Sequence, residues 1–180
     1  VARHTDESID IEKPTHCPSC NSLLVEDGAN LFCHNKNCNK QINERITHFC
    51  SRNAMNIDGV SSKTIDKLRE EFDITSCADL YYISYEQLLN LDKFKDKKAK
   101  KFIDSIEKSK KCNFNNFLYA LGINGVGEKT ALDLSKNFKS LEELKDASVE
   151  DLVKINDIGN IMAEDIYKFF HNEAELSLID

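Results

Sequence analysis

The sequence predicts a mostly α fold, in which a small four-cysteine unit precedes a helical domain made of repeated turns. Three observations predict this class. Four of the seven cysteines lie within one short segment, similar turns recur at nearly constant spacing, and apolar residues between the turns follow helical periodicity. No apolar run approaches the roughly 18 residues of a membrane helix, and no signal-peptide pattern opens the chain. We therefore expect no membrane segment and a cytoplasmic location.

The cysteine spacing is typical of metal ligands. Cys17 and Cys20 are separated by two residues, twelve residues follow, and four residues separate Cys33 from Cys38. Two such pairs can surround one zinc ion as a tetrahedron of thiolates. A 22-residue unit buries too little apolar surface to fold unaided, so metal binding would supply much of its folding free energy. Four sulfur ligands leave no open position, which favours a structural zinc.

Two alternatives to this ligand set remain open. The cysteines could pair as disulfides, and His16 or His34, which are adjacent to ligand cysteines, could replace one of them. The other three cysteines, Cys50, Cys77 and Cys112, are interpreted as small hydrophobic side chains.

A unit of about 65 residues occurs twice after the cysteines. Residues 55–64 match residues 121–130 at an offset of 66, and residues 76–99 match residues 140–163 at an offset of 64. Each copy contains two candidate turns. Their centres are Val60, Phe94, Val126 and Ile158, at intervals of 34, 32 and 32 residues. The predicted arrangement is four helix-hairpin-helix motifs as a duplicated pair.

Helix signals flank these turns. Ser84 with Gln87 and Ser140 with Glu143 have the pattern of capping boxes, and Ser148 with Asp151 is a weaker example. Apolar periodicity predicts helices over 40–51, 62–72, 84–91, 96–110, 128–137, 148–155 and 160–170.

The turn is complete at Gly125-Val126-Gly127. Glycine permits positive φ and close approach, and the central apolar residue anchors the turn in the core. The next helix then presents free backbone N–H groups, which can bind a phosphate, and a following lysine such as Lys63 or Lys129 can add a charge-assisted contact. Such contacts read the nucleic-acid backbone rather than its sequence.

The other turns depart from this pattern. Ser61 and Asp157 each replace one glycine, whereas Lys93 and Lys95 replace both, so the second turn would depend on lysine charge. The candidate DNA-binding residues are Gly59, Val60, Ser61, Lys63, Lys93, Lys95, Lys97, Lys98, Gly125, Val126, Gly127, Lys129 and Gly159. The alternative is that the turns only pack a helical bundle and bind no ligand.

The charge distribution favours a polyanionic partner over one segment. The net charge of −7 resides in residues 139–180, where eleven acidic side chains face four lysines, whereas residues 93–111 hold nine lysines and three acidic side chains. Such a basic patch is either a footprint for nucleic acid or a solvated helix surface.

Together these motifs resemble the C-terminal part of bacterial-type NAD-dependent DNA ligases. The resemblance lies in the four-cysteine finger, the segment 48–59, the segment 117–128 and the four turns, and it covers the chain from Pro14 onward. It implies that residues 1–13 are the tail of a preceding OB-fold or a linker, that 14–39 form a zinc finger, and that 40–180 form a helix-hairpin-helix DNA-binding domain. The resemblance also implies that a BRCT domain would follow Asp180. Since the chain begins with Val1, we expect a fragment or a processed product.

The resemblance also implies a function. Family members seal nicks in duplex DNA during replication and repair, using NAD and Mg or Mn bound by other domains. The nucleophilic lysine lies in a Lys-x-Asp-Gly motif, which neither Asp27-Gly28 nor Asp58-Gly59 completes, so no catalytic residue is assigned here. The segment would grip nicked duplex DNA as a monomer, in a cytoplasmic, nucleoid-associated enzyme.

Three other classes remain as alternatives. The first is a DNA-binding module of a repair nuclease or helicase. The second is a protein-interaction domain whose acidic end, residues 142–180, docks a basic partner. The third is a stand-alone enzyme, which no nucleophile–base arrangement in the sequence supports.

Overall fold

The structure is a computed structural model, and it describes residues 13–92, 94–177 and 179. The chain forms two compact units, Val1–Ile42 and Asn43–Asp180. The segment predicted as an OB-fold tail or linker lies outside the described residues, except for Lys13. None of the helices in the described part of the chain combines the length and the apolar character needed to cross a membrane.

The first unit contains a β-hairpin that the sequence analysis did not predict. Strands β1 (Leu24–Asp27) and β2 (Asn30–Cys33) pair antiparallel, with Leu24 opposite Cys33 and Asp27 opposite Asn30. Gly28 has a φ of 59° in the two-residue turn, a conformation that glycine adopts without steric cost. The hairpin carries Cys33 at its end, so it positions one of the four cysteines.

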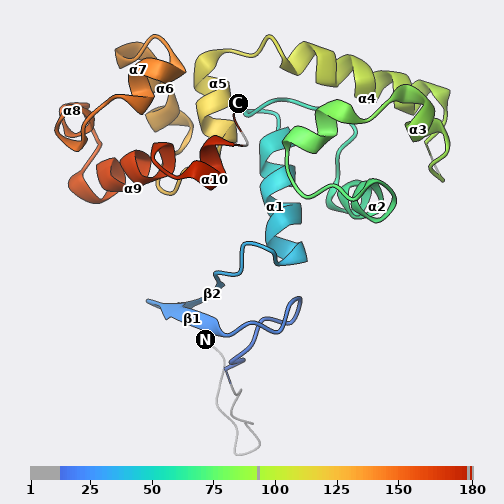
Figure 1. The fold of residues 1–180 in the computed structure, drawn as a ribbon, viewed down its shortest axis with the longest axis horizontal. Helices are drawn as coiled ribbons and strands as arrows, with labels where there is room; N and C mark the ends of the chain where they lie inside the picture. The colour runs from blue at the N-terminus through green and yellow to red at the C-terminus, as the bar shows by residue number, and fades with distance from the viewer. Residues whose placement is uncertain (1–12, 93, 178, 180) are drawn as a thin grey trace, which may run out of the picture. The chain divides into compact units, whose positions relative to one another are not determined.

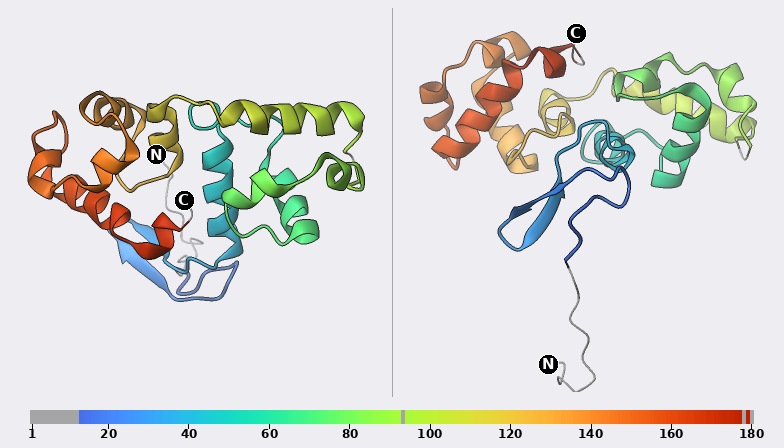
Figure 2. Two further views of the ribbon diagram at one scale, coloured as in Figure 1. Left: turned by 45° about the horizontal axis from the view of Figure 1, so that its top comes forward. Right: turned by 60° about the horizontal axis from the view of Figure 1, so that its bottom comes forward.

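The second unit is helical (Figure 1). Helix α1 (Asn39–Cys50) begins in the first unit and ends in the second. The remaining helices are α2 (Ser62–Phe72), the 3-10 helix η1 (Ala78–Tyr82), α3 (Tyr85–Leu89), α4 (Asp96–Ser109), α5 (Phe114–Ala120), α6 (Glu128–Asn137), α7 (Leu141–Lys145), α8 (Val149–Val153), α9 (Asn160–Phe170) and α10 (Glu173–Leu176). Figure 2 shows α2, α3 and α4 in one group and α6 to α10 in another.

The mostly α class and several individual helices agree with the sequence prediction. Helices α2, α6 and α9 have the predicted bounds, and each follows one of the turns. Helices α3 and α8 are shorter than predicted, whereas α5, α7 and α10 were not predicted.

The helix caps differ from the prediction at one position. Ser84 with Gln87 and Ser148 with Asp151 both form complete capping boxes. At Ser140 only half of the box forms, because the hydroxyl accepts from the Glu143 amide while the Glu143 carboxylate accepts from the backbone N–H of Lys139 at 2.6 Å. The predicted full box at Ser140 is therefore wrong.

The repeat positions have equivalent burial. Leu68 and Leu134, which are 66 residues apart, are both completely buried. Leu88 and Leu152, which are 64 residues apart, are at most 1% exposed. The group of helices α6 to α10 packs around Leu134 in a core that includes Leu118, Leu144, Leu152 and Ile166.

Residues in the segment 48–55, at the end of α1 and just after it, contact helix α5. The Nε2 atom of His48 lies 2.8 Å from the carbonyl oxygen of Tyr119, and the two rings meet edge to face with centroids 4.7 Å apart. The backbone carbonyl of Asn53 accepts a hydrogen bond from the Asn116 side chain, and the side-chain amide of Asn53 donates one to the Glu128 carboxylate, both at 2.7 Å. Two of the segments that carry the family resemblance thus hold each other in place.

We expect Leu134→Ala to destabilise the helical unit by about 2–5 kcal/mol, since removing a fully buried side chain leaves a cavity. The control is Leu132→Ala on the same helix, where the side chain is 41% exposed and the cost should be below about 1 kcal/mol. Urea unfolding followed by circular dichroism measures both, and equal losses would contradict the assignment of the core.

Candidate metal centre and nucleic-acid interface

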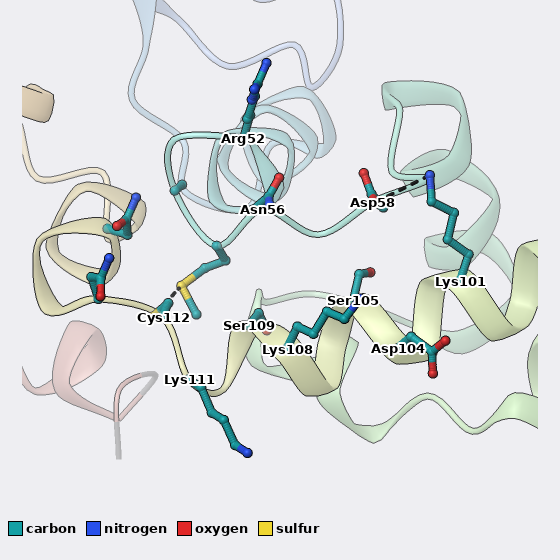
Figure 3. Close-up of a pocket in the computed structure, with 14 residues that line it drawn as sticks. Arg52, Asn56, Asp58, Lys101, Asp104, Ser105, Lys108, Ser109, Lys111 and Cys112 are labelled. Carbon is teal, nitrogen blue, oxygen red and sulfur yellow. Dashed lines mark hydrogen bonds and ion pairs between the residues drawn. The ribbon is translucent and has the colours of Figure 1, made fainter.

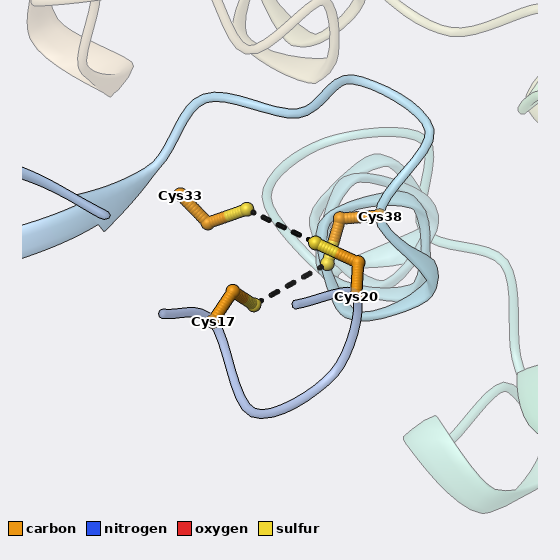
Figure 4. Close-up of side chains that lie close together, drawn as sticks. All are labelled: Cys17, Cys20, Cys33 and Cys38. Atoms are coloured by element: carbon orange, nitrogen blue, oxygen red, sulfur yellow. Dashed lines mark hydrogen bonds between the residues drawn. The ribbon is translucent and has the colours of Figure 1, made fainter. Parts of the chain in front are cut away.

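The four predicted cysteine ligands converge in the first unit. The Sγ atoms of Cys17, Cys20, Cys33 and Cys38 all lie within 4.8 Å of one another, and Figure 4 shows the four side chains pointing toward a common centre. The sulfur–sulfur distances are 3.9 Å for Cys17–Cys38 and 3.5 Å for Cys20–Cys33. A tetrahedron of sulfurs about 2.3 Å from a zinc ion has edges of about 3.8 Å, whereas a disulfide bond is about 2.05 Å long. The arrangement fits one metal ion.

Neighbouring polar groups stabilise thiolates in this cluster. The Ser22 hydroxyl lies 3.3 Å from Cys20 Sγ and accepts a hydrogen bond from the Asn35 side chain at 3.0 Å. Hydrogen bonding with the side chain and then with the backbone of Ser22 lowers the pKa of Cys20 to about 6. The Gln41 amide likewise lowers the pKa of Cys38. Such hydrogen bonds orient ligands and favour the charged form that binds a metal.

The sulfurs also affect one another. The largest contribution at Cys33, a hydrogen bond from the Asn35 amide, lowers its pKa, but burial and the neighbouring cysteine sulfurs together raise the pKa to about 12. Four thiolates therefore do not all ionise easily beside each other, and a divalent cation would compensate their charge.

Among the described residues, the other cysteines and the two candidate histidines, His16 and His34, do not belong to the cluster of possible metal ligands. Cys50 is buried, and burial raises its pKa as well as that of Cys77, the latter to about 12. Burial also raises the pKa of Cys112, whose Sγ lies 3.6 Å from Met55 Sδ. These three thiols are poor nucleophiles and poor metal ligands.

The four turns share one backbone geometry where the structure describes them. The first residue has positive φ in three of them, at Gly59 (79°), Gly125 (76°) and Asp157 (65°). The corresponding residue of the second turn, Lys93, lies outside the described residues. The central residues Phe94, Val126 and Ile158 are buried, and Val60 is half-buried. The third residue of each turn is extended and is the N-cap of the following helix.

The second glycine of the turn has a different role from the first. Gly127 and Gly159 have φ of −85° and −84°, which any residue can adopt. A Cβ atom at either position would meet nothing within 4 Å. Both residues are exposed, so the missing side chain leaves open space in front of the helix N-terminus.

Side-chain caps are distributed unevenly among the helices. Helices α3, α7, α8 and α10 are capped by Ser84, Ser140, Ser148 and Asn172. Helices α4, α6 and α9, which follow the last three turns, have no side-chain cap. Two elements that do not follow a turn, the 3-10 helix η1 and helix α5, also lack one. Helix α2 is capped by Ser61. The N-terminal amides of α4, α6 and α9 thus remain available to an external acceptor.

The predicted lysines lie beside these helix ends but differ in their partners. Lys63, Lys95 and Lys97 are exposed and make no ion pair within the described residues. The Lys98 ammonium lies 3.9 Å from the centroid of the Phe94 ring, and its pKa is lowered by burial and by Lys67. Lys129 forms an ion pair with Asp157.

Polar contacts bring the turns together in pairs. In the first pair, the Asp58 carboxylate lies 3.4 Å from the Lys101 ammonium of α4. In the second pair, the Asn124 side chain donates to Asp165 of α9 at 2.6 Å. These two contacts occupy matching positions of the repeat.

A polar pocket of about 430 Å³ lies between the loop after α1, helix α4 and the start of α5 (Figure 3). Arg52, Lys108 and Lys111 are among its lining residues, but Figure 3 shows Arg52 and Lys111 pointing in opposite directions, and Lys101 is paired with Asp58. The positive charges do not converge on one point, so no ligand is assigned to it.

Comparison with known proteins identifies both the motif and the relatives. A family model described as "Helix-hairpin-helix motif" matches residues 116–179, which contain the third and fourth turns. The chain is 52% identical over 168 residues to "DNA ligase 2" of Clostridium acetobutylicum, a match that covers 93% of this chain and 25% of that protein. It is 49% identical to "DNA ligase" of Clostridium botulinum (strain Hall) over all of this chain and 27% of the relative, and 46% identical to "DNA ligase" of Finegoldia magna over 97% and 27%.

The chain thus spans about a quarter of the length of the curated relatives it matches. The resemblance predicted from its motifs is confirmed: nearly the whole chain is homologous to one segment of bacterial DNA ligases.

Proposed function

We propose that this chain is the DNA-binding segment of an NAD-dependent DNA ligase and holds nicked duplex DNA while other domains seal the nick. The observation that carries the proposal is the set of uncapped helix N-termini at α4, α6 and α9, each preceded by a turn whose central residue is buried. Exposed N–H groups at a helix N-terminus bind phosphate through hydrogen bonds and the helix dipole.

The contacts would follow the DNA backbone. Gly127 and Gly159 leave room for a phosphate, Gly125 supplies the positive φ of the third turn, and Lys129 can add charge there. At the first turn Ser61 caps its own helix, so Lys63 would carry more of the interaction. At the second turn Lys95 and Lys97 flank the buried Phe94 and would act mainly by charge. Backbone contacts of this kind give binding without sequence preference.

A duplicated arrangement of four motifs supports this grip. The N-caps Ser61, Lys95, Gly127 and Gly159 stand at the spacing of the sequence repeat, and burial matches at equivalent positions. Two equivalent hairpin pairs can contact a duplex at successive positions, which multiplies weak phosphate contacts.

The first unit would be a zinc finger over residues 14–39, with the helix-hairpin-helix domain over 40–180. Cys17, Cys20, Cys33 and Cys38 would hold the ion, which supplies folding free energy and leaves no position for a reactant. Zinc is the preferred ion because four thiolates in a tetrahedron are its usual structural ligand set.

The parent protein would form phosphodiester bonds with NAD and Mg or Mn bound outside this segment. It would act as a monomer in replication and repair, in the cytoplasm at the nucleoid. Relatives named DNA ligase, and the fact that the chain spans a quarter of their length, support the division of labour between this segment and the rest of the enzyme.

Gly127→Val is expected to weaken binding to a nicked duplex by roughly tenfold, equivalent to one hydrogen bond to a charged group of about 1.5 kcal/mol. The new side chain has space in the protein and fits the observed φ, so the fold should persist. Gel-shift titration measures affinity, and circular dichroism checks folding. Gly159→Val makes the same change at the fourth turn and tests that contact separately. Unchanged affinity of a folded Gly127→Val chain would exclude the third turn from the interface.

Chelation of the metal is expected to release one zinc ion per chain and to unfold residues 17–38, while the helices of the second unit stay largely formed. Metal analysis of the released ion and far-ultraviolet circular dichroism measure the two effects. Loss of all helical signal on chelation would show that the units do not fold separately, and release of a different metal would refute zinc.

A further inference from the structure

One ion pair joins the third turn to the fourth. The Lys129 ammonium, at the second residue of α6, donates to the carboxylate of Asp157, the first residue of the fourth turn. Hydrogen bonding to Asp157 is the main cause that raises the pKa of Lys129. The cation that would meet a phosphate at the third turn is therefore already bound to a carboxylate of the same chain.

The backbone at residue 157 does not require an aspartate. Its φ of 65° falls in the left-handed region, where the equivalent residues of the first and third turns are Gly59 and Gly125. Glycine adopts this conformation with least strain, and aspartate tolerates it better than most residues. What aspartate adds at this position is a negative charge.

The residues equivalent to Lys129 in the first and fourth turns differ from it in charge or in pairing. Lys63 also lies two residues after its N-cap, and among the described residues it makes no ion pair. The same position of the fourth turn holds Ile161, which is 81% exposed. Hence the first turn offers a free cation, the third a neutralised cation, and the fourth no cation at this position.

Other charges near Lys129 do not change this assignment. Asp133, one helical turn further along α6, has a weaker electrostatic effect on Lys129 than Asp157 has. Its carboxylate accepts a hydrogen bond from Lys136 at 2.8 Å. Glu128 accepts a hydrogen bond from Asn53. Asp157 is the only one of these acidic groups that is hydrogen-bonded to Lys129.

We propose that Asp157 is an affinity-setting residue of the DNA interface: its carboxylate occupies the place on Lys129 that a DNA phosphate would take, so the third turn engages DNA by exchanging one anion for another. This inference rests on the proposed function. The side chains of Lys129 and Asp157 are 72% and 57% exposed, so the pair is screened by solvent and can open. Lys129 then adds less to DNA affinity than Lys63, because its ion pair with Asp157 must break before it can contact a phosphate.

The test compares four forms of the metal-loaded 180-residue chain with the unmodified chain: Asp157→Asn, Lys129→Gln, the double variant and Asp146→Asn. Asparagine tolerates positive φ, so Asp157→Asn should fold. Asp146→Asn makes the same charge change at an exposed residue outside the four turns and serves as the matched control. Fluorescence anisotropy with a labelled nicked duplex measures affinity over a range of KCl concentrations.

Asp157→Asn is expected to bind several-fold more tightly at low salt, because the phosphate contact of Lys129 no longer requires the ion pair with Asp157 to open. The slope of log affinity against log salt should steepen by up to about 0.9, the value for one phosphate contact that no internal pair opposes. Asp146→Asn should change affinity less and leave the slope unaltered. In the Lys129→Gln background, the added Asp157→Asn change should have no larger effect than Asp146→Asn has.

Two results would overturn the inference while leaving the proposed function intact. One is equal effects of Asp157→Asn and Asp146→Asn. The other is a full gain from Asp157→Asn in the absence of Lys129. A lack of salt-dependent binding in every form, the unmodified chain included, would instead overturn the proposed function and the inference with it.

Discussion

Burial of one apolar side chain at the centre of each of the last three turns is the constraint on which the rest of the proposed interface depends. With Phe94, Val126 and Ile158 buried in the helical unit, the chain must leave each turn in an extended conformation and begin the next helix at the surface. The first N–H groups of that helix have no intrahelical acceptor, and their exposure follows from the packing. The proposed phosphate binding would thus follow from how the turn is anchored, and it would need no particular side chain at the N-cap.

The distribution of side-chain caps is consistent with free N–H groups after the last three turns. Serine and asparagine cap the N-termini of α3, α7, α8 and α10, none of which follows one of the four turns. The helices after the last three turns lack such caps and retain free donors. His48 and Asn53, through Tyr119 and Glu128, tie the end of α1 and the loop after it to the helices around the third turn. A rigid base of this kind keeps the exposed amides in fixed positions.

The sequence predicted the features that depend on local chemistry. Glycine and serine in the turns located the starts of α2, α6 and α9, and the cysteine spacing predicted the cluster of four sulfurs. Short elements were missed, because α5, α7 and the strands of the hairpin are too brief for a periodic pattern to distinguish them from loops. The contacts of Lys129 with Asp157 and of His48 with Tyr119 join residues far apart in the chain. Only the comparison of the four turns, which places Asp157 at the position of Gly59 and Gly125, could have drawn attention to the first of these.

The proposed function requires that turn amides, rather than side chains alone, hold the DNA. An amide-resolved nuclear magnetic resonance titration of the metal-loaded chain with a nicked duplex tests it most directly. We expect the largest shifts for the backbone N–H signals of the first residues of α6 and α9, with α4 also affected. Shifts confined to lysine side chains, or to amides outside the turns, would contradict it.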